Sequence, residues 1–168
     1  MIAAAVMPDY ILETRGWLPK PRAEIFPFFA DPANLARITP PWLGFRLLSP
    51  AAPMEAGTVF DYRISWLGVP LRWRAFIREF DPPVRFVDVQ VRGPYTRWEH
   101  RHLFLEEAGG TWMEDRVTYR LPLGPLGRFA HVVLVQRQLA AIWRYRQRRI
   151  GELVAPVLSG PGRAPAAS

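Results

Sequence analysis

Two histidines and one aspartate in a predicted β-hairpin are the residues best suited to chemistry in this sequence. His100 and His102 are two positions apart in RWEHRHLF, and Asp115 follows in TWMEDRVTYRL. Because side chains alternate across a strand, both histidines are expected on the face that also carries Trp98 and Phe104. A carboxylate beside an imidazole supports acid–base catalysis near neutral pH, and two imidazoles with a carboxylate are also a ligand set for iron or zinc.

The sequence leaves several roles open for this cluster. It can orient the strands through hydrogen bonds, contact the polar end of a bound ligand, or transfer protons in a cyclase or dehydratase. A metal site built from His100, His102 and Asp115 has the weakest support, because histidine pairs of this kind are common and the register between the strands is inferred. We therefore expect no metal and no other cofactor.

Other catalytic classes lack a motif in this sequence. The chain has no cysteine, which excludes thiolate catalysis, disulfides and cysteine-ligated metals. Its one lysine, Lys20, lies between two prolines, and neither Ser49 nor Ser65 has the sequence context of a nucleophile turn. No glycine-rich phosphate loop is present. Acyl-enzyme, Schiff-base and P-loop chemistry are therefore not expected.

A series of predicted strands must position the histidine–aspartate cluster. The hairpin of residues 97–121 is expected to turn at Gly109-Gly110, with both glycines at the positive φ angles of a tight turn. Its second strand places Met113, Asp115 and Tyr119 on one face. Further strands are predicted over residues 10–17, 45–49, 58–66, 71–80 and 84–92.

The facing of residues 84–92 stays open. Their apolar side chains predict an inner face formed by Val87, Val89 and Val91. A one-residue bulge would exchange the two faces of the strand. Asp88 and Gln90 would then point inward and become ligand contacts.

Helices are predicted on either side of these strands. Two short helices are expected within PRAEIFPFFADPANLARI, and a long amphipathic helix over residues 129–153. Arg146 falls on the inner side of the long helix, where it can pair with a strand carboxylate, extend to the helix end, or bind an anionic ligand group. Arg137, Arg144 and Arg148 face water, whereas the inner side carries Val132, Val135, Leu139, Ile142, Trp143, Ile150 and Leu153.

Length and composition predict one folded domain. The chain has 168 residues, a net charge of +7 and 49% hydrophobic residues. We expect a domain over residues 1–158 and a disordered tail over residues 159–168, which are rich in Gly, Pro, Ala and Ser. The arginines are spread along the chain, so nucleic acid is not an expected partner. The absence of cysteine fits a cytoplasmic protein, and peripheral membrane contact and a homodimer are left open.

Together these elements predict an α+β fold, with a curved antiparallel sheet of about seven strands wrapped around the long C-terminal helix and two short helices after the first strand. The segments FVDVQVRGPYTRWEHRHLF and GGTWMEDRVTYRLPLGPLG, in this order of elements, resemble the helix-grip fold of the START and polyketide-cyclase superfamily (SRPBCC). The resemblance extends over roughly Tyr10 to Val154, and the two segments are similar to bacterial ligand-binding members of this superfamily.

This resemblance implies a cavity between sheet and helix that binds a small hydrophobic molecule, such as a lipid, polyketide or quinone, as a carrier or sensor. A cyclase- or dehydratase-like enzyme is the alternative, because the superfamily includes both. Its catalytic candidates would be His100, His102 and Asp115. The side chains expected to line the cavity are Tyr62, Trp73, Trp98, His100, His102, Met113, Asp115, Tyr119 and Trp143.

Overall fold

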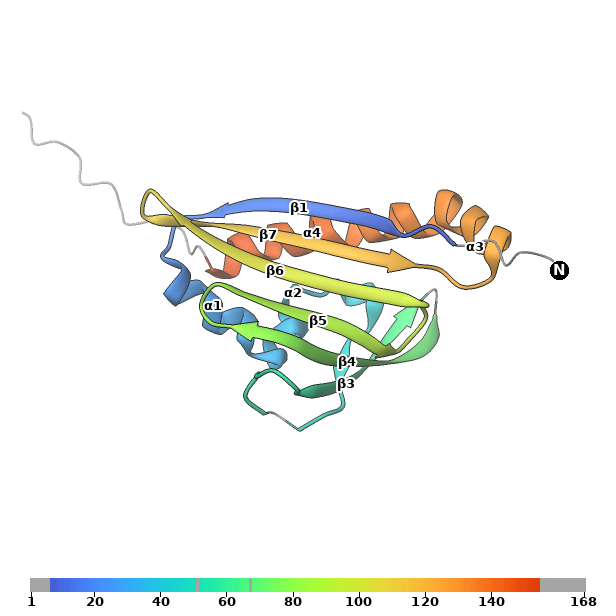
Figure 1. Ribbon diagram of the computed structural model, residues 1–168, viewed down its shortest axis with the longest axis horizontal. Helices are drawn as coiled ribbons and strands as arrows, with labels where there is room; N and C mark the ends of the chain where they lie inside the picture. Colours follow the sequence, from blue (N-terminus) through green and yellow to red (C-terminus); the bar gives the residue numbers. More distant parts are fainter. Residues whose placement is uncertain (1–6, 51, 67, 155–168) are drawn as a thin grey trace, which may run out of the picture.

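A seven-stranded antiparallel sheet and one long helix dominate the computed structural model, which describes residues 7–50, 52–66 and 68–154 (Figure 1). The strands lie in the order β1-β7-β6-β5-β4-β3-β2. The predicted tail over residues 159–168 lies outside the described residues. The strands are β1 (Tyr10–Leu18), β2 (Arg46–Leu47), β3 (Val59–Trp66), β4 (Val69–Asp81), β5 (Arg85–Arg92), β6 (Arg97–Glu107) and β7 (Gly110–Arg120).

The helical segments lie on one face of this sheet (Figure 1). Helix α1 contacts β6, and α2 contacts α4. No helix in the described ranges is both long and apolar enough to cross a membrane. The segments are α1 (Arg22–Ala30), η1 (Pro32–Asn34), α2 (Leu35–Ile38), η2 (Pro41–Leu43), α3 (Gly124–Ala130), the π-helical η3 (His131–Val135) and α4 (Gln136–Val154).

This architecture confirms the predicted α+β helix-grip fold. The sheet buries the apolar stripe of each strand against the helices, as side-chain alternation requires. Trp73 and Ile77 of β4 are buried in this way. One hydrophobic cluster gathers around Phe104 and α1, and a second gathers around Trp98 and Trp143 of α4. The inner face of the sheet is therefore covered from two sides.

The C-terminal helical region begins earlier than predicted. The long helix was expected to begin at residue 129, but α3 starts at Gly124 and continues through η3 into α4. A π-helical segment has more residues per turn than an α-helix, so it changes which side chains face inward. Val135 remains buried, whereas Val132, expected on the inner side, is 66% exposed.

The β6–β7 hairpin turns one residue earlier than predicted. Ala108 and Gly109 have positive φ angles of 48° and 78°, and Gly110 already pairs with Glu107 in the sheet. Two consecutive positive φ angles are typical of the type I′ turns that match the twist of a hairpin. Gly110 is needed for another reason, because a Cβ atom there would lie 2.3 Å from the ring of Trp17.

In strand β5, Asp88 faces inward, which is the alternative that the sequence allowed for residues 84–92. Irregularities in the β4–β5 register lie between Arg74 and Ala75 and between Ile77 and Glu79. Asp88 faces the inside of the protein, and Val91 is 62% exposed. The expectation of a valine-lined inner face was therefore wrong, because the pairing with β4 rather than the hydrophobic pattern sets the facing.

The close approach at Gly110 gives a first prediction. The Gly110→Ala substitution should destabilise the protein by about 1–3 kcal/mol, because the added methyl overlaps Trp17 and the Leu18 carbonyl. Gly16→Ala, on the neighbouring strand β1, is the matched control, since no atom lies within 4 Å of its added Cβ. Urea unfolding measures both. Equal free energies of unfolding for the two variants would contradict the packing described here.

Candidate functional site

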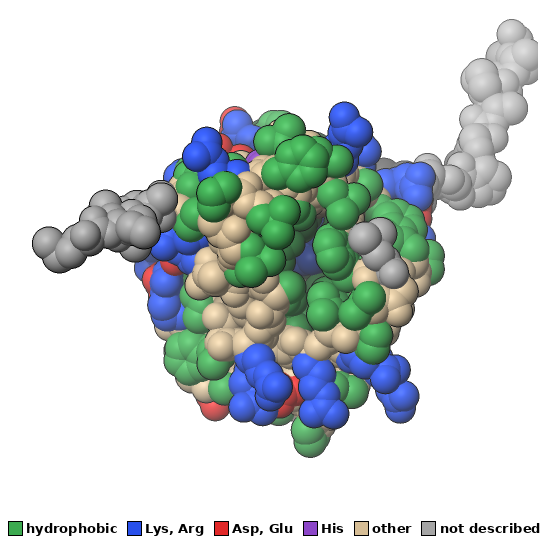
Figure 2. All heavy atoms as spheres, turned by 90° about the vertical axis from the view of Figure 1, so that its right-hand side faces the viewer, with side chains coloured by type: hydrophobic (Ala, Val, Ile, Leu, Met, Phe, Trp, Pro, Cys, Tyr) green, Lys and Arg blue, Asp and Glu red, His purple; other side chains and the backbone are tan. Residues whose placement is uncertain are grey.

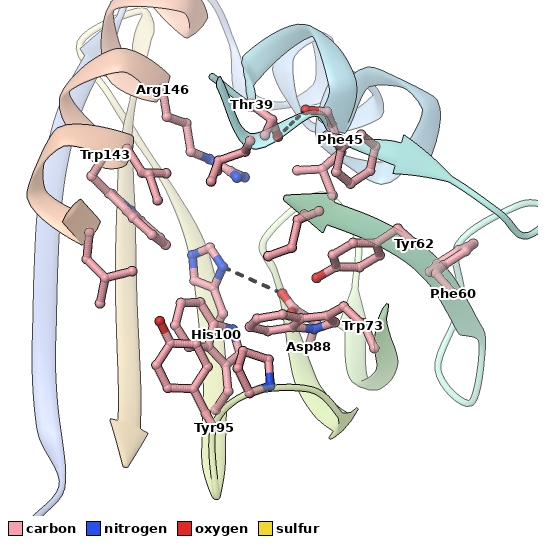
Figure 3. A pocket seen from close by; sticks show the side chains of 18 of the residues that line it. Thr39, Phe45, Phe60, Tyr62, Trp73, Asp88, Tyr95, His100, Trp143 and Arg146 are labelled. Atoms are coloured by element: carbon pink, nitrogen blue, oxygen red, sulfur yellow. Dashed lines mark hydrogen bonds and ion pairs between the residues drawn. The ribbon is translucent and has the colours of Figure 1, made fainter. Parts of the chain in front are cut away.

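A cavity of about 530 Å³ lies between the inner face of the sheet, α4 and the short helices (Figure 3). Its volume is within the range of about 300–1,000 Å³ that is typical of small-molecule sites. Phe45, Phe60, Tyr62 and Trp73 come from the β2–β4 side, and Trp143 faces them from α4 (Figure 3). Most of the wall is therefore apolar or aromatic.

The aromatic side chains of the wall pack against one another. Tyr62 and Trp73 are stacked, with ring centroids 5.8 Å apart and planes at 14°. Trp98 meets Trp73 edge-on, at 5.1 Å between centroids, and lies 6.2 Å from Trp143. The indole nitrogens of Trp73 and Trp143 are buried without a hydrogen-bond partner in the described part of the chain. A ligand with an acceptor group can satisfy them.

Six of the nine predicted cavity residues line this space, and three do not. The six are Tyr62, Trp73, Trp98, His100, His102 and Trp143. Met113 packs in the cluster around Phe104, and the Tyr119 hydroxyl is 2.8 Å from His131 Nε2. Asp115 lies behind the histidines. The strand face was predicted correctly for all three, but their positions along β7 place them beyond the cavity.

His100 and His102 lie between two carboxylates contributed by the neighbouring strands. Asp88 of β5 is opposite His100, and Asp115 of β7 is opposite His102. His100 Nε2 is 3.0 Å from Asp115 Oδ1, and His102 Nδ1 is 2.8 Å from the same oxygen, although its ring is poorly aligned for a hydrogen bond. On the cavity side, Asp88 Oδ2 lies 3.7 Å from His100 Nδ1 and 3.5 Å from His102 Nε2.

Burial and charge shift the protonation of these groups in different directions. Burial lowers the pKa of His100, and the neighbouring His102 lowers it further. Burial also opposes a charge on His102, but Asp115 and Asp88 outweigh it and raise the pKa of His102. Burial would raise the pKa of both carboxyls, yet the histidines outweigh it, and the pKa of Asp115 lies well below its usual range. Both carboxylates are therefore ionised, and His102 accepts a proton more readily than His100.

Arg146 projects from α4 into the same cavity (Figure 3). Its Nε is buried without a hydrogen-bond partner, and no carboxylate in the described part of the chain forms an ion pair with it. The strand salt bridge that was one expectation for this residue is therefore not formed. An arginine in this position is a donor that is free for an anionic group.

The cavity reaches the end of the molecule where α3 begins. Pro94, Tyr95 and Leu126 line it there, and Leu123, Leu126 and Phe129 are exposed to solvent. Figure 2, which looks onto this end, shows a hollow ringed by hydrophobic side chains, with Lys or Arg side chains around it. This end of the cavity is therefore surrounded by hydrophobic side chains.

Several wall residues were not identified from the sequence. Asp88 was left open because its facing depends on the register with β4, and Tyr95 follows a Gly-Pro turn with no strand pattern of its own. Gln90 does not line the cavity, since its side-chain Nε2 donates a hydrogen bond to the Tyr95 carbonyl oxygen at 2.6 Å. Asp88 lies opposite His100 in the antiparallel pair of β5 and β6. This pairing could have identified Asp88 as a wall residue, but only once the strand order and register are known.

The shared contact of both histidines with Asp115 gives a second prediction. Asp115→Ala should lower the free energy of unfolding by about 3–5 kcal/mol, because it leaves two buried imidazoles without the nearer of their two carboxylate partners. Glu114→Ala removes a neighbouring carboxylate that makes only an exposed ion pair with Arg15, and should cost about 0–1 kcal/mol. Chemical denaturation of both variants measures the difference. A cost below about 1 kcal/mol for Asp115→Ala would contradict this account of the cluster.

Comparison with known proteins supports the fold described above. A family model described as "Polyketide cyclase / dehydrase and lipid transport" matches residues 18–142. TTHA0849 from Thermus thermophilus is 20% identical with a TM-score of 0.60, over 89% of this chain and 100% of that chain. Ara h 8.0201 is 15% identical with a TM-score of 0.58, over 86% of this chain and 99% of that chain. No curated protein sequence matches this chain.

One similar structure belongs to a much longer protein. The nucleoside-diphosphate sugar epimerase from Corynebacterium glutamicum is 25% identical with a TM-score of 0.62, over 84% of this chain but 28% of that chain. The epimerase name therefore describes a protein of which this chain matches a small part. The family model, in contrast, spans well over half of this chain. The chain belongs to the polyketide cyclase / dehydrase and lipid transport family, within the START and polyketide-cyclase superfamily that its sequence resembles.

Proposed function

We propose that this protein binds a small apolar ligand with an anionic head group, as a carrier or sensor. The observation that carries the proposal is Arg146, a cation without an ion-pair partner in the described residues, in the wall of a mostly apolar cavity of about 530 Å³. A partly buried, unpaired guanidinium is stabilised when a carboxylate or phosphate binds it. In this proposal the head group binds Arg146.

The apolar walls supply affinity for the rest of the ligand. Each methylene group that moves from water into such a cavity contributes about 0.8 kcal/mol. The stacked and edge-on rings of Tyr62, Trp73 and Trp98 also suit a flat or cyclic group. The family description, with polyketide chemistry and lipid transport together, supports a ligand of this apolar class.

A cyclase- or dehydratase-like enzyme is the second candidate, and the histidine cluster is what favours it. His100 lines the cavity and has Asp115 on its far nitrogen, which is the arrangement of an oriented acid–base imidazole. In such an enzyme His100 or His102 would transfer a proton at the ligand, while Asp115 holds the rings. The two candidates differ in what happens to the ligand.

Recovery of the bound molecule separates carrier from enzyme. We expect native mass spectrometry of the freshly purified protein to show an apolar adduct that organic solvent releases. A carrier or sensor returns an added ligand with unchanged mass and unchanged chromatographic retention after prolonged incubation, whereas a cyclase would change the retention even where the mass stays the same. A ligand whose mass falls by one water, with the loss abolished in His100→Gln, would instead establish the dehydratase candidate.

The head-group assignment gives a third prediction. Arg146→Gln should weaken the binding of dodecanoate by about 10- to 100-fold, since a hydrogen bond to a charged group contributes about 1.5–3 kcal/mol. Dodecanol has the same tail without the charge, so its affinity should change little. Arg144→Gln, on the exposed side of the same helix, is the matched control. Isothermal titration calorimetry that shows equal affinity for dodecanoate in both variants would contradict the assignment.

A further inference from the structure

Three side chains on the cavity wall present donor atoms to a common point. Asp88 Oδ2 lies 3.5 Å from His102 Nε2 and 3.7 Å from His100 Nδ1. One donor atom from each residue lies within 4.8 Å of the other two. A tetrahedral ion with bonds of about 2.1 Å holds its ligand atoms about 3.4 Å apart. Small rotations of these side chains are therefore enough to bring all three atoms to bonding distance.

Asp115 Oδ1 lies beside one nitrogen of each ring, and the other nitrogen of each ring lies beside Asp88. His100 Nε2 donates to Asp115 Oδ1 at 3.0 Å, so in the neutral ring the Nδ1 lone pair points toward Asp88. His102 likewise has its Nδ1 beside Asp115, at 2.8 Å, and its Nε2 beside Asp88. A histidine that binds a metal usually has a carboxylate or carbonyl at its other ring nitrogen.

The charges of the cluster also fit a divalent cation. Asp88 and Asp115 are 17% and 5% exposed at their side chains, so two carboxylates lie in a poorly solvated region. A lone pair of His100 that faces the Asp88 carboxylate is repelled unless a cation or proton lies between them. A divalent ion would neutralise both carboxylates and leave Arg146 free to bind an anion.

We infer that Asp88, His100 and His102 bind a divalent transition-metal ion, with its remaining coordination positions open to the cavity. Two imidazoles and one carboxylate with open positions are a ligand set of zinc and of non-haem iron(II) sites. This set differs from the one considered from the sequence, which had Asp115 as the carboxylate. It also departs from the expectation that no metal is bound. The inference depends only on these side chains and not on the proposed apolar ligand.

Cobalt(II) titration tests the inference without any organic ligand. Protein treated with EDTA and then dialysed should bind one equivalent of Co²⁺, with the visible absorption bands of a low-coordinate cobalt site, and Zn²⁺ should displace it. Asp88→Asn keeps the shape of the side chain and should weaken binding at least 10-fold, on the order of a lost ligand. His131→Gln is the matched control, since His131 is the one other histidine and bonds Tyr119 instead.

The outcomes separate this inference from the proposed function. Arg146→Gln should retain the cobalt spectrum, because Arg146 is not a ligand. Asp115→Asn should weaken cobalt binding by about 10- to 100-fold, as expected for a group that orients the ligands. Circular dichroism confirms that each variant is folded. Absence of cobalt binding to the wild-type protein, or equal binding in Asp88→Asn and His131→Gln, would overturn the metal site and leave the apolar ligand proposal standing.

Discussion

The width of the sheet is the constraint on which the rest of this structure depends. Seven strands about 4.8 Å apart span about 29 Å, whereas one helix with its side chains is about 10–12 Å across. Helix α4 alone therefore cannot cover the inner face of the sheet. Helix α1 covers the part around Phe104, where the side chains pack into a solid core. Over the remaining part, large aromatic side chains line a space that they do not fill.

The same constraint explains where the polar groups lie. Strand β6 is an interior strand of the sheet, so each of its inward-facing residues has a neighbouring strand on both sides. His100 and His102 lie on this strand, and β5 and β7 each contribute one carboxylate. Arg146 faces the cavity from the helix (Figure 3). This polar part of the cavity is thus built from three adjacent strands and α4.

Much of this arrangement follows from local rules. Alternation along a strand was enough to predict the fold class and the inward faces of Tyr62, Trp73 and His100, because each strand buries one face. The i, i+2 spacing of the histidines likewise placed both on one side. Helical periodicity put Trp143 and Arg146 on the inner side of the long helix, as found. These features depend on a few neighbouring residues.

Other features depend on contacts that a single strand does not encode. Asp88 points inward because of how β5 pairs with β4, and the valines around it suggested the opposite. Met113 has the right facing but lies where α1 fills the space, so it belongs to the core instead of the cavity. The hairpin turn lies one residue earlier than predicted, because Ala108 adopts a positive φ angle. For Met113, the face of the strand on which the side chain lies was thus predictable. Its position relative to the cavity was not, because that position depends on how the helices pack against the sheet.

A crystal structure with a bound ω-brominated dodecanoate tests the central claim most directly. The anomalous signal of bromine locates the tail, and the electron density locates the carboxylate. We expect the carboxylate within hydrogen-bonding distance of Arg146 and the bromine between the aromatic walls formed by Tyr62, Trp73 and Trp98. A cavity closed by rearranged side chains, or a ligand bound outside it, would contradict the proposed binding site.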